Sequence, residues 1–162
     1  PRTTILFANG YDYIGTTEEK FDVILVDSSD PIGPSAVLHR REFFAKLKKI
    51  LKPRGIIAAQ SGSAIFQLES IRQKRLFLEQ MFRYAYFYLG PVPTYPGGLW
   101  CYLFLSDWIN PLRGPRKEII PGLKYYSQSI HRACFSLPPF FLTKGKNPIE
   151  EFTILRKLAD ER

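Results

Sequence analysis

Hydrophobic residues in the first half of this chain follow two alternating patterns, short unbroken runs and helically spaced positions. The runs VILV at residues 23–26 and IIAA at residues 56–59 contain many β-branched residues and are too short for a buried helix. Such runs are typical of strands buried on both faces of a parallel sheet. The run TILFA at residues 4–8 predicts a further short buried strand, followed by a turn at Asn9 and Gly10.

Two segments between and after these runs have helical spacing. Residues 40–52 predict a helix that ends before Pro53 and Gly55, with apolar residues on one side and lysines opposite. Residues 64–82 predict a second helix with a similar apolar side. Residues 11–17 predict a short helix or a loop. The order of strands and helices is that of a doubly wound α/β sheet.

The pattern changes after residue 82. Residues 84–92 and 99–105 are two β-rich runs, and the Pro- and Gly-rich segment between them predicts a hairpin. A short helix is predicted around residues 129–134. A last helix is predicted to begin at Asn147 and Pro148, because proline is favoured at the first helical position.

Composition narrows the class of protein. The 162 residues correspond to one domain, and the formal charge of +8 is scattered in short basic runs, such as residues 72–75, which we interpret as solvated helix faces. No nucleic-acid-binding motif accompanies this charge, and no apolar run reaches the length of a membrane span. Cys101 and Cys134 lack metal spacing, which favours thiols in a reducing compartment, the cytoplasm. Pro1 and the residues after it show no initiator methionine or signal-peptide pattern, so we expect a piece of a longer protein.

Two aspartates follow the predicted strand at residues 23–26. Asp27 and Asp30 lie three residues apart, and Pro31 and Pro34 stiffen the segment behind them. Ligands bind beyond the carboxyl ends of strands in open α/β sheets, which favours a functional site here. An ordinary turn has the same composition, because Asp and Ser hydrogen-bond their own backbone. The spacing alone leaves both interpretations open.

Four segments carry a resemblance to a known family, and it extends from residue 1 to about residue 141. They are FDVILVDSSDPIGP (21–34), PTYPG (93–97), LKYY (123–126) and IHRACFSLP (130–138). In this order they resemble the aminopropyltransferases known as spermidine synthases, of which the chain corresponds to the C-terminal half to two-thirds. The resemblance implies the Rossmann-like sheet of S-adenosylmethionine-dependent methyltransferases, mostly parallel and ending in an antiparallel hairpin.

The resemblance also implies a reaction. An aminopropyl group passes from decarboxylated S-adenosylmethionine to putrescine, giving spermidine and methylthioadenosine, with no metal or further cofactor. The attacking amine is cationic at neutral pH and must first lose a proton, which a carboxylate within hydrogen-bond reach can accept. Asp27 matches the family's general base, Asp30 the acid that holds the diamine, and Tyr95 the tyrosine that orients the attacking nitrogen. Gln60 lies where the family has a polar residue near the amine. Tyr95 as a turn aromatic packed between two prolines remains an alternative.

The donor side of the site is matched by a second set of residues. Asn9 and Gly10 fall where the family contacts the adenine amino group, although the family usually has aspartate in place of Asn9. The residues matched to the adenine and the thioether are Asp27, Ser28, Pro34, Ser35 and Leu38. His39 and His131, the only histidines, are predicted to be structural.

Part of the family's site has no counterpart in this sequence. The Gly-rich turn and the acid that binds the ribose lie upstream of the matched region in the family. We therefore expect a second chain carrying the N-terminal half, in a homo- or hetero-oligomer. Residues 1–143 are interpreted as the C-terminal portion of the catalytic domain and residues 144–162 as a helical extension.

Other functions stay open at this point. Agmatine, cadaverine and spermidine are alternative acceptors, since a different pocket length is enough to change the amine that is used. A methyltransferase on the same fold and a non-catalytic half-fold partner are the other candidates. A nucleic-acid binder would predict salt-dependent binding to DNA.

Overall fold

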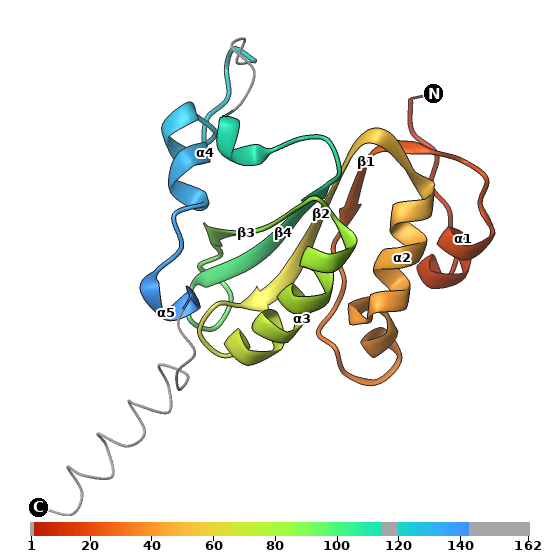
Figure 1. Ribbon diagram of the computed structural model, residues 1–162, viewed down its shortest axis with the longest axis horizontal. Helices are drawn as coiled ribbons and strands as arrows, with labels where there is room; N and C mark the ends of the chain where they lie inside the picture. Colours follow the sequence, from red (N-terminus) through yellow and green to blue (C-terminus); the bar gives the residue numbers. More distant parts are fainter. Residues whose placement is uncertain (1, 115–119, 143–162) are drawn as a thin grey trace, which may run out of the picture.

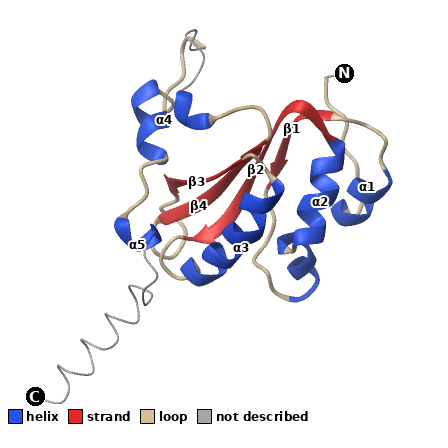
Figure 2. Cartoon of the chain, in the orientation of Figure 1, coloured by secondary structure: helices blue, strands red, loops and turns tan. Residues whose placement is uncertain are grey.

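The computed structural model describes residues 2–114 and 120–142, which form a small sheet with helices packed on it (Figures 1 and 2). The elements, in chain order, are α1 (Gly10–Thr16), β1 (Phe21–Val26), the 3-10 helix η1 (Gly33–His39), α2 (Arg41–Ile50), β2 (Leu51–Ser63), α3 (Leu68–Met81), β3 (Tyr84–Pro91), β4 (Leu99–Ser106), the 3-10 helix η2 (Pro111–Arg113), α4 (Gln128–Cys134) and α5 (Pro139–Leu142).

The four strands lie in the order β1-β2-β4-β3. β1 pairs with β2 in parallel, and β4 pairs with both β2 and β3 in antiparallel fashion. β1, β2 and β3 therefore run in one direction and only β4 runs against them. This confirms the prediction of a mostly parallel sheet ending in an antiparallel hairpin. The hairpin's second strand returns into the sheet and separates β2 from β3.

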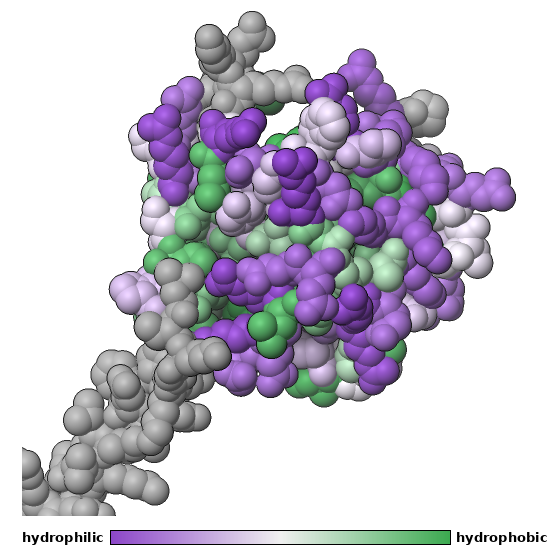
Figure 3. All heavy atoms as spheres, in the orientation of Figure 1, coloured by the Kyte–Doolittle hydropathy of each residue, from purple (hydrophilic) through white to green (hydrophobic). Residues whose placement is uncertain are grey.

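One face of the sheet carries the core. Amphipathic α2 and α3 pack on it, because their apolar residues recur at helical spacing and leave residues such as Lys49 of α2 on the outer side. Hydrophilic side chains, with some hydrophobic ones between them, cover most of the side of the molecule seen in Figure 3. The buried side chains of this core include Phe44, Leu47, Ile57, Leu68, Ile71, Leu78, Leu103 and Leu105.

The opposite face of the sheet is only partly covered. Phe135, which follows α4, packs its ring against Tyr86, Tyr88 and Phe104, on the face opposite to Leu103. At the other end of the sheet, Val23 and Leu25 of β1 are 55% and 76% exposed. The prediction that β1 is buried on both faces is therefore wrong for the described residues, since only its core-facing side is packed.

Several boundaries differ from those expected. Residues 4–8 form no strand, because no strand in the described part of the chain pairs with them, and Phe7 is fully exposed. β2 extends to Ser63, whose backbone N–H donates to Gln67 Oε1 at 2.8 Å, so α3 begins at Leu68 and not at residue 64. The basic run at residues 72–75 is not wholly solvated, since Lys74 is buried. The helix expected from Asn147, and with it the extension 144–162, lies outside the described residues.

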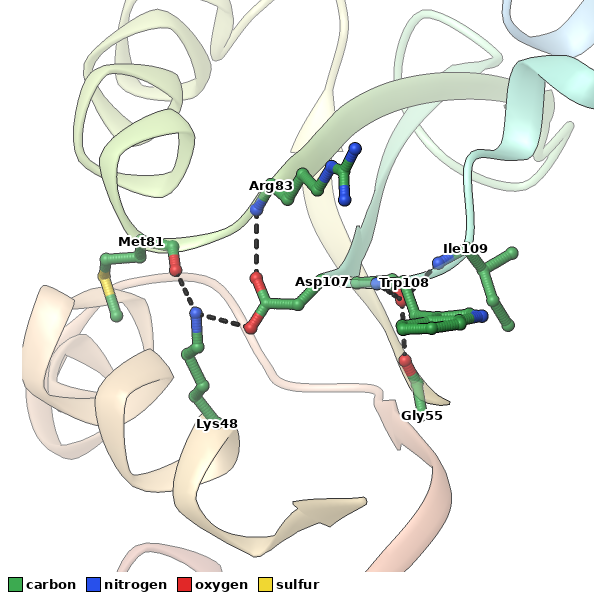
Figure 4. A network of polar contacts seen from close by, with 8 residues as sticks. Lys48, Gly55, Met81, Arg83, Asp107, Trp108 and Ile109 are labelled. Atoms are coloured by element: carbon green, nitrogen blue, oxygen red, sulfur yellow. Dashed lines mark hydrogen bonds and ion pairs between the residues drawn. The ribbon is translucent and has the colours of Figure 1, made fainter. Parts of the chain in front are cut away.

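The amino end of β3 and the carboxyl end of β4 are fastened to the helices by one polar network (Figure 4). Lys48 of α2 donates to the carbonyl of Met81 and pairs with Asp107 Oδ2 at 2.7 Å. Asp107 Oδ1 accepts from the backbone N–H of Arg83 at 3.0 Å. This network joins the ends of α2, α3, β3 and β4 in one corner. No helix in the described ranges combines the length and apolar character needed to cross a membrane.

Candidate active site

The acidic loop, residues 27–30, follows the carboxyl end of β1, beside the parallel strand β2, which continues to Ser63. Val26 is level with Ala59 in the register of the two strands, so Asp27 and Gln60 follow at neighbouring positions. A cleft of about 470 Å³ opens there. Its lining brings together the predicted residues Asp27, Ser28, Asp30, Gln60 and Tyr95 with Ser29, Val92, Pro96, Trp100 and Tyr102.

Both carboxylates of the acidic loop are exposed to the cleft, and neither forms an ion pair with a described residue. The loop itself is held in place. Ser35 Oγ donates to the carbonyl of Asp30 at 2.5 Å and to the carbonyl of Ile32 at 2.9 Å. Gln67 Nε2 lies 3.4 Å from Asp30 Oδ1. The arrangement presents two negative charges on a fixed backbone to whatever enters the cleft.

Gln60 lines the cleft beside the acidic loop. Its Oε1 accepts from Trp100 Nε1 at 2.8 Å, and its Nε2 donates to the carbonyl of Ser28. The amide is thus oriented by an indole on one side and by the acidic loop on the other. Gln60 therefore links the loop to β4 in addition to lining the cleft.

Tyr95 enters the cleft from the turn between β3 and β4. The turn closes through hydrogen bonds from Tyr95 N to the carbonyl of Val92 and from Gly98 N to the carbonyl of Tyr95, both 3.0 Å long. Gly97 and Gly98 have φ values of 85° and 64°, which glycine adopts without strain. The Tyr95 ring lies 4.6 Å from that of Trp100 and is half exposed. Its packing partner is thus an aromatic ring of the cleft.

Trp100 and Tyr102 are residues of the cleft that the sequence analysis did not single out. They alternate with Cys101 and Leu103 along β4, so period-two alternation placed them together on one face. Tyr102 is opposite Gln60 in the strand register, and its ring stacks on Tyr88 at 5.2 Å. Burial and then the negative charge of Asp27 raise the pKa of Tyr102, which keeps its phenol protonated.

Most of the residues matched to the donor do not line this cleft. Asn9 is exposed at the start of α1, where its Oδ1 caps the helix by accepting from Tyr11 N at 2.9 Å, and Gly10 is the first helical residue. Pro34, Ser35 and Leu38 lie in η1, and Leu38 packs against the core. Ser28 and Asp27 are the members of the donor set that line the cleft. The role of the others stays a prediction.

Three comparisons with solved structures define the class of protein. The human methyltransferase-like protein 13, solved with SAH, matches 74% of this chain with a TM-score of 0.51 at 24% identity, which shows a shared fold alone. A spermidine synthase solved in complex with the transition-state analogue AdoDATO matches 86% of the chain with a TM-score of 0.75 at 34% identity. The spermidine synthase of Thermotoga maritima matches with a TM-score of 0.72. The sheet is thus of the Rossmann-like methyltransferase type.

Sequence comparisons define the family. Residues 1–111 match the spermine/spermidine synthase domain. The polyamine aminopropyltransferase of Moorella thermoacetica is 40% identical over 151 residues, 93% of this chain, and that of Bacillus subtilis is 35% identical over 141 residues. The chain belongs to the spermine/spermidine synthase family. It spans about half the length of the relatives it matches, 53% of the first and 51% of the second.

Proposed function

We propose that this chain is one half of an aminopropyltransferase that moves the aminopropyl group of decarboxylated S-adenosylmethionine to putrescine. The products would be spermidine and methylthioadenosine. The observation that carries the proposal is that Asp27, Asp30 and Tyr95 line one cleft, with neither carboxylate in an ion pair among the described residues. Two free carboxylates beside aromatic rings suit a flexible diammonium ligand, through charge-assisted hydrogen bonds and cation–π contact.

Asp27 is the proposed general base. An alkylammonium titrates near the lysine value of about 10.4, so the acceptor arrives protonated and unreactive. Asp27 takes one proton from the nitrogen, and the freed lone pair attacks the carbon bonded to the sulfonium. The carbon–sulfur bond breaks, its electron pair stays on sulfur, and the neutral thioether leaves. Because the positive sulfur already activates the leaving group, this reaction needs no metal.

Asp30 and Tyr95 have positioning roles in this proposal. Asp30 would bind an ammonium group of the diamine and hold its chain in the cleft, while Tyr95 would orient the reacting nitrogen. Holding the nitrogen in line with the carbon–sulfur bond is itself a large part of catalysis. Gln60 would act on the same ligand both directly and through the loop that it holds. Other amines of different length remain candidates for the acceptor.

The donor would bind on the other side of Asp27, towards Ser28 and η1. Asn9, Gly10, Pro34, Ser35 and Leu38 are proposed to contribute there. Their separation from the acidic cleft is consistent with a donor site completed by other residues. The uncovered side of β1, with Val23 and Leu25 exposed, supports a second body of protein packed on this end of the sheet. We call the assembly of this chain with that second half, joined to it or separate, the complete enzyme, and we expect it in the cytoplasm.

Product analysis tests the proposal. The complete enzyme is incubated with decarboxylated S-adenosylmethionine and, separately, with putrescine, agmatine, cadaverine or spermidine, and products are followed by mass spectrometry. The expected result is that putrescine reacts fastest and that spermidine is its product. Faster transfer to another amine would identify that amine as the acceptor. Transfer of a methyl group from S-adenosylmethionine would identify a methyltransferase. Absence of any transfer would favour a non-catalytic partner. Tight binding of methylthioadenosine by this chain alone, in calorimetry, would contradict the need for a second half.

A further inference from the structure

A buried cation lies directly behind the acidic loop. Lys74 on the inner side of α3 is only 5% exposed, although lysine is almost never fully buried without a partner of opposite charge. Among the residues that the structure describes, no carboxylate forms an ion pair with it. Its Nζ lies instead 3.1 Å from Ser61 Oγ and 3.2 Å from His39 Nδ1. A burial so unfavourable for a charge points to a role beyond packing.

The directions of these hydrogen bonds follow from the donors and acceptors present. A protonated lysine only donates, so His39 Nδ1 must accept from it. The proton of a neutral His39 is then on Nε2, which lies 3.0 Å from the carbonyl oxygen of Ser29 and donates to it. Ser28 Oγ lies 3.5 Å from the same nitrogen. One tautomer of His39 satisfies both of its strong contacts.

The chain of contacts ends on the backbone between Asp27 and Asp30. Ser28 and Ser29 are the two residues that separate Asp27 from Asp30, so His39 holds the backbone of the acidic loop at its middle. The same loop is held by Gln60 from β2 and by Ser35 from η1. Gln67, the N-cap residue of α3, contacts the side chain of Asp30. The link through His39 and Lys74 connects the loop backbone to the body of α3, and it contains titratable groups.

We propose that Lys74 and His39 are positioning residues of the reaction, which aim the two carboxylates by holding the Ser29 carbonyl from α3. This inference rests on the function proposed above for Asp27 and Asp30. It adds a consequence for acidic pH: a second proton on His39 turns Nδ1 into a donor, which cannot accept from Lys74. The link to α3 is then lost, and the loop is released from one of its supports.

The groups around His39 determine the pH at which its ring takes up the second proton. Burial lowers the pKa of His39 below its ordinary value of 6.5, the carbonyl of Ser29 and the charge of Asp30 act to raise it, and Lys74 acts to lower it. Burial also lowers the pKa of Lys74 to about 8, with Cys101 acting to raise it, so lysine stays mostly protonated at neutral pH. The neutral histidine and the charged lysine therefore coexist around pH 7.

Nuclear magnetic resonance tests the link without any assay of activity. Long-range proton–nitrogen correlations of the complete enzyme at pH 7 should show His39 as the tautomer with hydrogen on Nε2. His131 is the only other histidine of this chain, and the signals that disappear in His39→Gln of the complete enzyme are those of His39. The tautomer with hydrogen on Nδ1, or a doubly protonated ring at pH 7, would overturn the proposal even if the enzyme transfers aminopropyl groups.

A matched pair of variants tests the role in catalysis. Glutamine at position 39 keeps one donor and one acceptor without titrating near neutrality, whereas leucine keeps neither. H39Q should retain turnover, and the acidic limb of its pH profile of kcat/KM should move to lower pH. H39L should lose roughly tenfold to a hundredfold in kcat/KM, which is the scale of a small misplacement of reacting groups. A purely structural role would leave the acidic limb of H39Q where it is in the unchanged enzyme, and that outcome rejects the proposal.

Lys74→Met completes the test, with Lys49→Met on the exposed side of α2 as control. Replacing a buried charge by an apolar side chain of similar length should leave the unfolding midpoint equal or higher. We expect kcat/KM of Lys74→Met to fall roughly tenfold despite this stability, and that of Lys49→Met to stay unchanged. Unchanged kcat/KM in Lys74→Met would refute the role. Absence of aminopropyl transfer in the unsubstituted enzyme would refute the proposed function instead, and the tautomer would still decide the link.

Discussion

Trp100 Nε1 donates to Gln60 Oε1 at 2.8 Å, and this bond joins β4 to the acidic loop through the other end of the same amide. Trp100 also lies against Tyr95. One indole therefore supports both the residue that holds the loop and the tyrosine that faces it. The shape of the cleft depends on a strand that is far from the acids in the sequence.

The first prediction concerns this indole. Trp100→Phe keeps the ring packed but leaves Gln60 Oε1 without its donor, which should lower the free energy of unfolding by about 1 kcal/mol. We expect a KM for the amine that rises severalfold, with a smaller change in kcat. Urea denaturation and steady-state kinetics measure the two effects. Trp108→Phe, at an exposed position outside the cleft, is the control; an equal rise of KM in both variants would contradict the role of the bond.

The second prediction tests Asp27 as the general base against another carboxylate close by in the sequence. Asp27→Asn in the complete enzyme should reduce kcat by roughly two orders of magnitude or more, the scale of losing a general base. Asp22→Asn, on the same strand, removes an exposed carboxylate that pairs with Lys52 and should leave kcat unchanged. Single-turnover measurement of spermidine formation gives the rates. Undiminished turnover of Asp27→Asn would remove Asp27 from the role of base.

The third prediction gives Asp30 a different signature. An amide in its place keeps the shape but loses a charge-assisted hydrogen bond to the diamine, about 1.5–3 kcal/mol. We expect KM for putrescine to rise roughly tenfold to a hundredfold in Asp30→Asn, with kcat falling less than in Asp27→Asn. Initial rates over a range of putrescine concentrations decide this. A loss confined to kcat would assign both acids to the same step.

The fourth prediction concerns stability at low pH. Burial raises the pKa of Asp107, but the hydrogen bonds from Lys48 and the Arg83 backbone outweigh it, and the pKa is held below its ordinary value. The stabilisation by Asp107 is therefore complete above the unfolded pKa of about 3.9 and is lost as the pH falls through the lower folded value. Because both partners are partly exposed, the effect should stay below about 1 kcal/mol.

Urea denaturation at pH 7 and near pH 2 measures the contribution of Asp107 to the free energy of unfolding. Asp107→Asn should lower the free energy of unfolding at pH 7 and converge with the unsubstituted chain at the acidic end. Lys48→Met added to Asp107→Asn should bring little further loss if the two residues act as a pair. A constant difference at both pH values would mean that charge on Asp107 is not the cause.

The fifth prediction addresses the uncovered face of β1. Leu25→Asp places a charge where the second half is proposed to pack and should weaken its association, measured by analytical ultracentrifugation or by co-purification. Leu76→Asp on α3, similarly exposed but on the other side of the sheet, is the matched control and should assemble normally. Equal assembly of both variants would show that this face is not the contact.

Local patterns in the sequence were sufficient to predict α2, α3 and the closing hairpin, because helical spacing and turn residues depend only on residues close by in the sequence. They failed at residues 4–8, since an apolar run becomes a strand only beside a partner strand, and no described residue supplies one. The acidic loop could be found because its two aspartates directly follow a strand. Trp100 and Tyr102 could not be placed in the cleft, because that required knowing that β4 lies beside β2.

The burial of Lys74 was not predicted, for a different reason. Lys74 lies three residues after Ile71 and four before Leu78, so helical spacing put it on the buried side of α3. The composition of the run at residues 72–75 suggested a solvated face instead. The position of a charge on the helix was more informative than the number of charges around it.

The place of β4 between β2 and β3 also determines when the sheet can be completed. In the described residues β3 has no partner other than β4, and the indole that orients Gln60 is carried by β4 itself. As the chain leaves the ribosome, β1, β2 and the acidic loop are made before β4, which carries the indole that orients Gln60. Synthesis must therefore pass Ser106 before the cleft has its complete lining of Gln60, Trp100 and Tyr102.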